Sequence, residues 1–160
     1  MSDAELVIHH LNLSRSTRIV WLAEELGVPY ELTEHRRDAT MRAPASLGAV
    51  HPLGKAPVIE IDGIVVAESG AIVELLCERA GRLAPAPGTP ERSAFLEWLH
   101  FAEGSAMMPI IIELLSMFMG EGATAGVTPF FAPERGRVLS HLEQLSTALN
   151  RRGIPNWVEV

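Results

Sequence analysis

Apolar and polar positions along this 160-residue chain follow two patterns, a mixed strand-and-helix pattern first and a purely helical one afterwards. The stretch "ELVIHH" from Glu5 predicts a short strand. From Ser16 the apolar residues form a wide helical stripe that ends at Gly27. The apolar positions of that stripe are Ile19, Val20, Trp21, Leu22, Ala23 and Leu26. A strand followed by an amphipathic helix therefore opens the chain.

The next part of the chain predicts a second strand, a hairpin and a second helix. "VPYELTEH" alternates apolar and polar residues, with its proline at the start of the strand, where the missing N–H is tolerated. An irregular stretch follows, with one short helix after Pro44. "PVIEIDGIVVAES" places two β-rich runs around Asp62-Gly63, a pair suited to a type I′ turn. "SGAIVELLCERAG" then predicts a helix that Gly81 closes.

The sequence "RLAPAPGTP" interrupts this pattern with three prolines and a glycine, which is typical of an interdomain linker. Beyond it every periodic stretch is helical, with one long helix from about Pro90, interrupted at Pro109, and another from about Glu134 to Asn150. The intervening "GEGATAGVTPFFAP" predicts a loop. We therefore expect three parts: an α/β domain over 1–83, a linker over 84–89 and an all-α domain over 90–160.

Composition and charge narrow the function classes. A chain with 48% hydrophobic and 21% charged residues is typical of a globular protein. The formal charge of -7 comes without a basic stripe, which disfavours a nucleic-acid partner. The one cysteine, Cys77, excludes an internal disulfide and a four-cysteine zinc site, and we expect it to be inert on the apolar side of its helix. The six histidines lack metal-ligand spacing, and His9 and His10 should point to opposite faces of a strand, so no metal is expected.

Two further features concern where the protein works. The N-terminus has no basic-then-apolar signal pattern. With one cysteine in the chain, a reducing cytoplasm is the default expectation. The most apolar run, "AMMPIIIELLSMFMG" from Ala106, contains Pro109 and Glu113 and is too short to span a bilayer. It predicts a buried helix, or one that faces a protein partner, and no membrane association.

The candidate chemistry begins where the first strand meets the first helix, in "HHLNLSRSTRIV". Ser14 or Ser16 can cap the helix by accepting a hydrogen bond from a free backbone amide. The same place can hold an anion or a thiolate, because a helix N-terminus carries about half a positive charge and unpaired N–H groups. A serine hydroxyl that donates to a bound thiol there favours the ionised thiol. The residues alone leave both interpretations open.

Two later stretches offer further polar groups. In "HPLGKAPVIEIDG", Ala56-Pro57 opens a strand, and Lys55 is either a solvated lysine or a clamp on a ligand carboxylate. In "AESGAI", Glu68 and Ser69 stand before a helix, which suits either a helix cap or an amino-acid site. In the second case Ser69 would bind the α-carboxylate and Glu68 the ammonium group.

In this order and spacing, "SRSTRIVWLAEELGVPYE", "HPLGKAPVIEIDG" and "AESGAIVELL" resemble the glutathione transferase superfamily, in its branches with serine at the activating position. The resemblance covers about residues 5 to 83. It implies a thioredoxin-like α/β domain, followed by an all-α domain of the glutathione-transferase type. It implies that Ser14 stabilises the thiolate of glutathione. The further glutathione-binding residues that it implies are Lys55, Ala56, Pro57, Glu68 and Ser69.

The resemblance also implies details of that binding. Ala56 would pair its backbone with the cysteinyl part of glutathione, and Pro57 would follow a cis peptide bond. Three arginines of the irregular stretch are candidates for the glycyl carboxylate, and nothing in the sequence selects among Arg36, Arg37 and Arg42.

The implied reaction is attack of the glutathione thiolate on a small hydrophobic electrophile that binds against the long helix. Trp98, Phe101 and the methionines near Met107 can line that pocket, or they can serve as core or dimer contacts. Glutathione-dependent isomerases, dehalogenases and peroxidases would use the same thiolate. A non-catalytic binding module with the transferase fold also stays open.

The helical part is short for this family. "LNRRGIPNWVEV" ends the chain without the hydroxyl–x–x–aspartate cap that opens a later helix in the family. A shortened domain should leave apolar faces uncovered. We therefore expect a homodimer that covers the apolar stretch from Ala106 to Met119.

Overall fold

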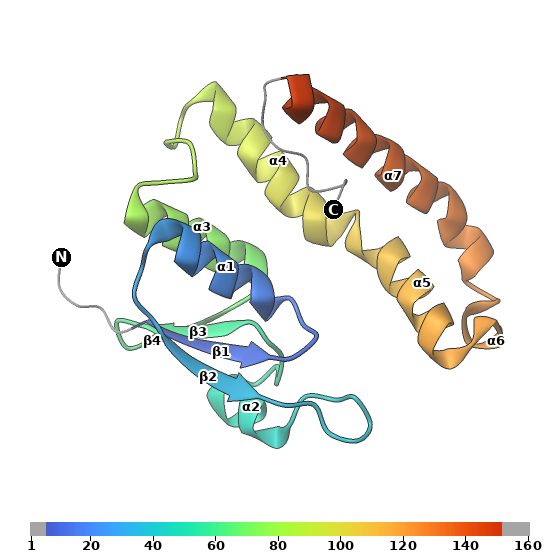
Figure 1. The fold of residues 1–160 in the computed structure, drawn as a ribbon, viewed down its shortest axis with the longest axis horizontal. Helices are drawn as coiled ribbons and strands as arrows, with labels where there is room; N and C mark the ends of the chain where they lie inside the picture. Colours follow the sequence, from blue (N-terminus) through green and yellow to red (C-terminus); the bar gives the residue numbers. More distant parts are fainter. Residues whose placement is uncertain (1–5, 152–160) are drawn as a thin grey trace. The chain divides into compact units, whose positions relative to one another are not determined.

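The computed structural model describes residues 6–151, which form two compact units that divide between Phe95 and Leu96 (Figure 1). The first unit contains β1 (Val7–Leu11), α1 (Ser16–Leu26), β2 (Glu31–His35), α2 (Ala45–Val50), β3 (Val58–Ile61), β4 (Ile64–Ala67) and α3 (Ser69–Ala80). Helix α4 (Pro90–Gly104) begins in the first unit and continues into the second. The second unit then contains α5 (Met107–Met119), α6 (Glu121–Thr124) and α7 (Thr128–Arg151).

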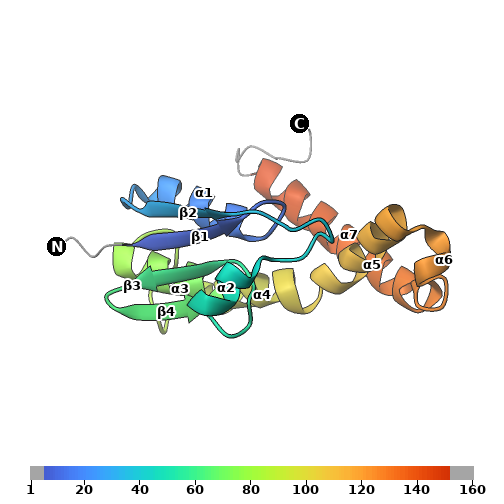
Figure 2. The ribbon, with the colours of Figure 1, turned by 90° about the horizontal axis from the view of Figure 1, so that it is seen from below.

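The four strands form one mixed sheet in the order β2-β1-β3-β4. β1 is parallel to β2 and antiparallel to β3, and β3 pairs with β4 as an antiparallel hairpin. Helices α1 and α3 cover one face of the sheet and α2 lies on the other (Figures 1 and 2). The thioredoxin-like α/β architecture implied by the resemblance is confirmed, as is the helical character of the part that follows.

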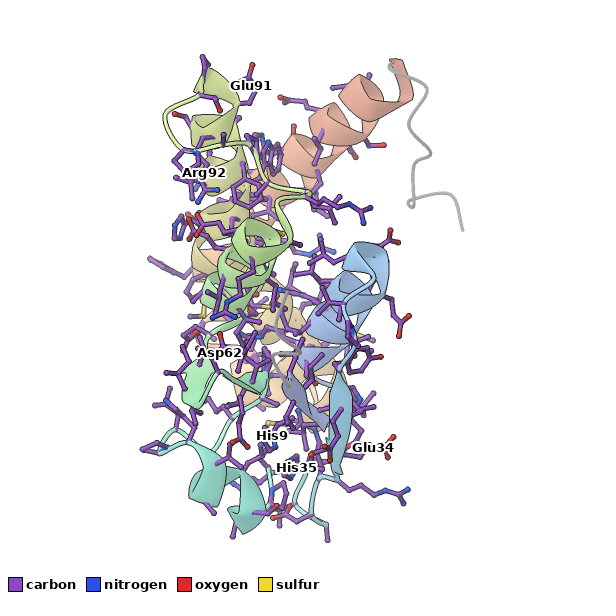
Figure 3. The ribbon with its side chains drawn as sticks, turned by 90° about the vertical axis from the view of Figure 1, so that its left-hand side faces the viewer. His9, Glu34, His35, Asp62, Glu91 and Arg92 are labelled. Atoms are coloured by element: carbon purple, nitrogen blue, oxygen red, sulfur yellow. The ribbon has the colours of Figure 1, made fainter. Side chains whose placement is uncertain are left out.

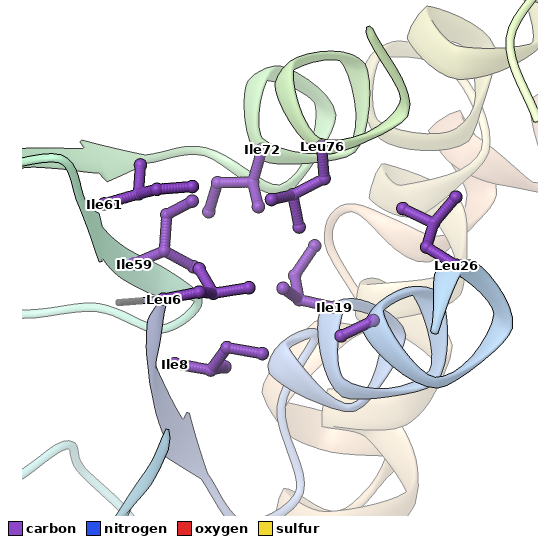
Figure 4. Packing of buried hydrophobic residues seen from close by; sticks show 9 residues of the cluster. Leu6, Ile8, Ile19, Leu26, Ile59, Ile61, Ile72 and Leu76 are labelled. Atoms are coloured by element: carbon purple, nitrogen blue, oxygen red, sulfur yellow. The ribbon is translucent and has the colours of Figure 1, made fainter. Parts of the chain in front are cut away.

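The core of the first unit lies between the sheet and the helices α1 and α3, where their apolar positions interdigitate (Figure 4). Alternate residues of the strands and residues four apart on the helices point into it, as periods of 2 and 3.6 require. Its buried members are Leu6, Ile8, Ile19, Ala23, Leu26, Ile59, Ile61, Ile72 and Leu76. Trp21, which we expected on the inward stripe, is 55% exposed, and its indole N–H donates to Glu25 at 2.9 Å.

The predicted turns and helix ends are present. Asp62 and Gly63 both have positive φ, 51° and 76°, as a type I′ turn between two strands requires. Helices α1 and α3 end at Gly27 and Gly81, each in the left-handed conformation of a C-terminal cap. The short helix expected after Pro44 is α2.

The helical part differs from the expectation in two places. The long helix is interrupted at Ser105–Ala106, between α4 and α5, and not at Pro109. Pro109 is the third residue of α5, where a backbone N–H has no intrahelical partner and its loss costs little. The expected loop after α5 instead contains α6 and the start of α7, which begins at Thr128 and includes Pro133. The residues after Arg151, including the divergent end "RGIPNWVEV", lie outside the described range.

The first turn of α4 is held within the first unit by Arg92. This side chain, labelled in Figure 3, is nearly buried. It forms ion pairs with Glu74 and, at 2.9 Å, Glu78, both on α3. It also donates to the carbonyl of Pro85 at 3.3 Å. Because a buried cation needs compensating partners, these bonds tie the proline-rich connection and the start of α4 to α3.

The second unit leaves many apolar side chains of α5 exposed in the described structure. We call these side chains the α5 surface: Met108, Ile110, Leu114, Leu115, Met117, Phe118 and Met119. Taken as one run, Pro90–Met119 is also long and apolar enough to cross a membrane by length and composition alone, with a mean hydropathy of 1.4 over 18 residues. The sequence expectation considered only the shorter run from Ala106. Core helices of soluble proteins pass the same test, so the finding identifies an apolar surface and not its partner.

Candidate functional site

Three loops that carry candidate residues meet at one edge of the sheet. β1 and β4 are both antiparallel to β3, so they run in the same direction and end at the same edge. Continuing the observed register places Leu11 opposite Ala56 and Pro57 opposite Glu68. The edge therefore brings together Ser14, Ala56-Pro57 and Glu68-Ser69. It is about 10 Å wide from β1 to β4, which matches the length of an extended tripeptide.

Two helices also begin at this edge. α1 starts at Ser16, just after β1, and α3 starts at Ser69, just after β4. Neither helix has an acidic side chain in its first turn. The first N–H groups of α1, those of Ser16, Thr17 and Arg18, already donate to Ser14 and Arg15. The positive dipole ends of the two helices are what favours an anionic ligand at the edge.

Ser14 is half-buried in the loop between β1 and α1. Its Oγ accepts a hydrogen bond from the backbone N–H of Ser16 at 3.2 Å and lies 2.7 Å from the Ser16 Oγ. The N-cap of α1 is Arg15 and has no side-chain cap hydrogen bond, so neither serine is the cap residue. The bond from the Ser16 N–H uses one lone pair of the Ser14 hydroxyl and leaves the rest of the hydroxyl available to a ligand.

Ser16 is fully buried behind Ser14 and connects it to the sheet. Its Oγ accepts from the backbone N–H of Leu11 at 3.1 Å and lies 2.9 Å from His10 Nδ1. We did not predict this contact from the sequence. The sequence pattern could have predicted the contact between His10 and Ser16, because a histidine near the end of β1 and a hydroxyl in the first turn of α1 fall on the same face of the sheet.

The two loops next to the edge contain non-glycine residues with positive φ. Glu68, directly before α3, has φ 72° and ψ 116°, and Leu13, directly before Ser14, has φ 52°. Such conformations cost about 1–3 kcal/mol each and concentrate at functional sites. The Glu68 side chain is exposed, whereas Ser69 is buried at the first position of α3.

The third loop leads into β3. The Ala56-Pro57 peptide bond is cis, as the resemblance implies. Pro57 is buried, Ala56 is half-buried and Lys55 is exposed. Lys55 is therefore accessible to a ligand at this edge.

One of the three candidate arginines has a structural task. The Arg37 guanidinium donates to the backbone carbonyls of Asn12 at 3.1 Å, Leu13 at 2.9 Å and Met41 at 2.8 Å. Its own N–H donates to Asn12 Oδ1 at 3.1 Å. Arg37 thus fixes the loop that carries Ser14. Arg36 and Arg42 are exposed.

A second polar cluster lies on the opposite face of the sheet, next to α2. His9 Nε2 is 2.8 Å from Glu60 Oε1, and His9 Nδ1 is 3.1 Å from His35 Nε2 (Figure 3). His35 Nδ1 is in turn 3.0 Å from Ser46 Oγ. Burial, and then the neighbouring His9, lower the pKa of His35 below its ordinary value. His9 and His10 therefore do occupy opposite faces, and each belongs to a different network.

Neither a thiol nucleophile nor a metal centre accompanies these clusters in the described residues. Burial raises the pKa of the Cys77 thiol, which keeps it protonated and unreactive. Within residues 6–151 no group of three His, Cys, Asp or Glu side chains is arranged to hold a metal ion.

The second unit contains an apolar groove of about 770 Å³, a size that suits a small ligand. Phe101 and Met108 line it together with Phe131, Val138 and His141. Trp98, our other candidate for a pocket, stacks on His141 with ring centroids 4.5 Å apart. Trp98 therefore packs α4 against α7, and Phe101 and Met108 are the expected residues that line the groove.

Comparison with known proteins agrees with this geometry. The family model described as "Glutathione S-transferase, N-terminal domain" matches residues 14–79. The chain is 44% identical to glutathione S-transferase 3 of Schizosaccharomyces pombe over 108 residues, covering 66% of this chain and 44% of that protein. It is 30% identical to glutathione S-transferase 1 of Saccharomyces cerevisiae over 123 residues, covering 72% and 53%. The chain thus spans about half the length of these relatives.

Solved structures show the same fold. A glutathione S-transferase of Actinobacillus pleuropneumoniae superposes with a TM-score of 0.72 at 35% identity, covering 87% of this chain and 65% of that one. A glutathione transferase of Phanerochaete chrysosporium, solved with oxidized glutathione, gives a TM-score of 0.70 at 21% identity, covering 90% and 68%.

The lowered pKa of His35 predicts an acid-sensitive stability. The unfolded chain binds a proton at this histidine below about pH 6.5, whereas the folded chain resists it. The contribution of neutral His35 to the free energy of unfolding is therefore complete above that pH and is lost as the pH falls below it. We expect the melting temperature to fall less for His35→Asn than for the parent chain between about pH 7.5 and pH 5.5. His100→Asn, at an exposed histidine, is the control, and equal pH dependence in parent and His35→Asn would contradict the prediction.

The positive φ of Glu68 predicts a site that stores backbone strain. Glu68→Gly should be more stable than Glu68→Ala by about 1 kcal/mol, because alanine keeps the Cβ that this conformation disfavours. Urea unfolding of the two variants measures the difference. An alanine variant as stable as the glycine variant would show that the position is unstrained.

Proposed function

Because this chain belongs to the glutathione transferase superfamily, we propose that its first unit binds glutathione at the sheet edge and stabilises the glutathione thiolate. The observation that carries this proposal is the position of Ser14. Its hydroxyl lies at the N-terminus of α1, on the same edge as Ala56-Pro57 and the start of α3. The names of the relatives and the glutathione-bound neighbour support it.

The proposed ligand lies along the edge with its γ-glutamyl end at α3. Ser69 and the N-terminus of α3 bind the α-carboxylate, and the exposed Glu68 carboxylate binds the ammonium group. Ala56 pairs its backbone with the cysteinyl part, so that the sulfur reaches Ser14. Lys55 directly precedes Ala56 in the sequence, so its side chain can reach the end of the tripeptide opposite the γ-glutamyl group.

The proposed chemistry is activation of a thiol by a hydrogen bond and not covalent catalysis by serine. Lowering the pKa of a thiol by about two units from a reference near 8.5 requires roughly 2.7 kcal/mol. One charge-assisted hydrogen bond from Ser14 and the positive end of α1 together supply an energy of this size. The thiolate then attacks an electrophilic carbon, forming a C–S bond as the leaving group departs. The proposed step uses glutathione and no metal.

We propose a small hydrophobic electrophile as the second substrate. The apolar groove of the second unit, with Phe101 and Met108, is of a size and character that support this choice. Conjugation of such compounds would serve detoxification, and the free, buried Cys77 is compatible with a reducing cytoplasm.

Other glutathione-dependent reactions would use the same edge. Isomerase, dehalogenase and peroxidase activities differ from transfer only on the electrophile side. A non-catalytic glutathione-binding module is an alternative that would use the same edge without the reaction.

The thiolate role predicts a specific loss in Ser14→Ala. Removing the hydroxyl that donates to the thiolate should reduce conjugation of chlorodinitrobenzene roughly 10- to 100-fold. Ser93→Ala, at an exposed position of α4, is the matched control and should retain the parent rate. Peroxide reduction assayed in parallel separates transfer from peroxidase activity. Conjugation at the parent rate in Ser14→Ala would exclude the assigned role, and no thermal shift with millimolar glutathione would exclude binding.

We further propose that the chain forms a homodimer through the α5 surface. Phe118, one of its members, is 75% exposed, and apolar patches of this kind mark interaction sites. Phe118→Glu should convert the dimer to a monomer in light scattering, whereas Leu83→Glu, at an exposed apolar residue of the first unit, should not. A monomeric parent that sediments with liposomes would show that the surface binds membranes instead.

A further inference from the structure

Three side chains form a line of hydrogen-bonding groups from the sheet to the candidate site. His10 Nδ1 lies 2.9 Å from Ser16 Oγ, and Ser16 Oγ lies 2.7 Å from Ser14 Oγ. Ser16 is fully buried and His10 and Ser14 are half-buried, so solvent does not reach the middle of the line. The direction in which the hydrogens point along it decides what Ser14 offers to a ligand.

The middle hydroxyl has few hydrogen-bonding options. A serine Oγ has one hydrogen and two lone pairs. One lone pair of Ser16 accepts the backbone N–H of Leu11 at 3.1 Å. One lone pair and the hydrogen remain for His10 and Ser14, with the carbonyl of Leu11 at 3.2 Å as a further acceptor. His10 therefore influences the orientation of the Ser16 hydroxyl.

The protonation of His10 Nδ1 selects between two arrangements. When Nδ1 carries a hydrogen, it donates to the free lone pair of Ser16, and Ser16 donates to Ser14. The lone pairs of Ser14 are then filled by the N–H and the hydroxyl of Ser16, so its own hydrogen points to the ligand. When Nδ1 carries none, Ser16 can donate to His10, and Ser14 turns its hydrogen inward to Ser16. A thiolate would then face an oxygen lone pair, which repels it.

We propose that His10 is a positioning residue: it donates from Nδ1 to Ser16 and so directs the Ser14 hydrogen toward the bound thiolate. This role rests on the proposed binding of glutathione. His10 acts through Ser16 and Ser14 and does not touch the substrate. Glu34 lies in register with His10 on β2, and Arg15 stands between the two serines in sequence. These charges stay unchanged in the variants that test the role.

The test compares two substitutions of His10, one that keeps a hydrogen-bond donor near the Ser16 hydroxyl and one that removes it. His10→Asn places an amide N–H near the position of Nδ1, and His10→Leu removes the donor without adding charge. The pKa of bound glutathione is measured from the ultraviolet absorbance of its thiolate as a function of pH. We expect His10→Asn to match the parent and His10→Leu to raise this pKa by about one unit. Should His10→Leu fail to fold, His10→Gln, whose amide lies further from Ser16, replaces it with the same expected result.

A structural role for His10 would give a different result. If His10 were only structural, His10→Leu would lower stability or glutathione affinity and leave the pKa of the bound thiol unchanged. That result would overturn the inference while the proposed function stands. Absence of glutathione binding to the parent chain would overturn both. Independently, the ¹⁵N shifts of His10 in the glutathione complex should show a protonated Nδ1, and a bare Nδ1 would overturn the inference.

Discussion

The site depends on one constraint of the sheet, the antiparallel placement of β3 between β1 and β4. Because β1 and β4 both run antiparallel to β3, they end at the same edge, and the helices that follow them begin there. This topology directs two positive helix ends at one place. It also sets the spacing of the ends of β1 and β4, after which Ser14 and Ser69 follow. The core between the sheet and α1 and α3 makes that spacing rigid, since nine apolar residues fix both helices on one face.

Ser16 shows how structure and candidate chemistry share the same groups. Its burial and its bond to the Leu11 N–H belong to the fold, since a buried hydroxyl must be satisfied. The same hydroxyl joins Ser14 to His10, so a group required for stability also orders the group proposed for function. Arg37 stabilises the same loop from the solvent side, because its guanidinium donates to the carbonyls of Asn12 and Leu13. The loop after β1 is therefore fixed from the sheet side and from the solvent side.

Signals that act between neighbouring residues predicted most of the first unit, whereas contacts between residues distant in the sequence could not be predicted. Asp62-Gly63, Gly27 and Gly81 act through their own backbone angles, so the turn and the helix ends could be predicted without knowing the fold. The contact of His9 with His35 joins residues 26 apart through parallel pairing, and no spacing rule encodes it. Pro109 was predicted to interrupt the long helix and Pro133 fell in a predicted loop, but the effect of a proline depends on its position within a helix that neighbouring contacts define.

Thiolate stabilisation and electrophile capture, the two halves of the proposed reaction, would involve different units of this chain. Stabilising a thiolate needs only the edge, the two helix ends and Ser14, all of which lie within residues 14–69. Capturing an electrophile would need apolar surface, and the second unit has an apolar groove of about 770 Å³. Since the proposed thiolate interactions all lie within the first unit, a change in the helical part should alter which electrophile is attacked before it alters whether the sulfur is charged.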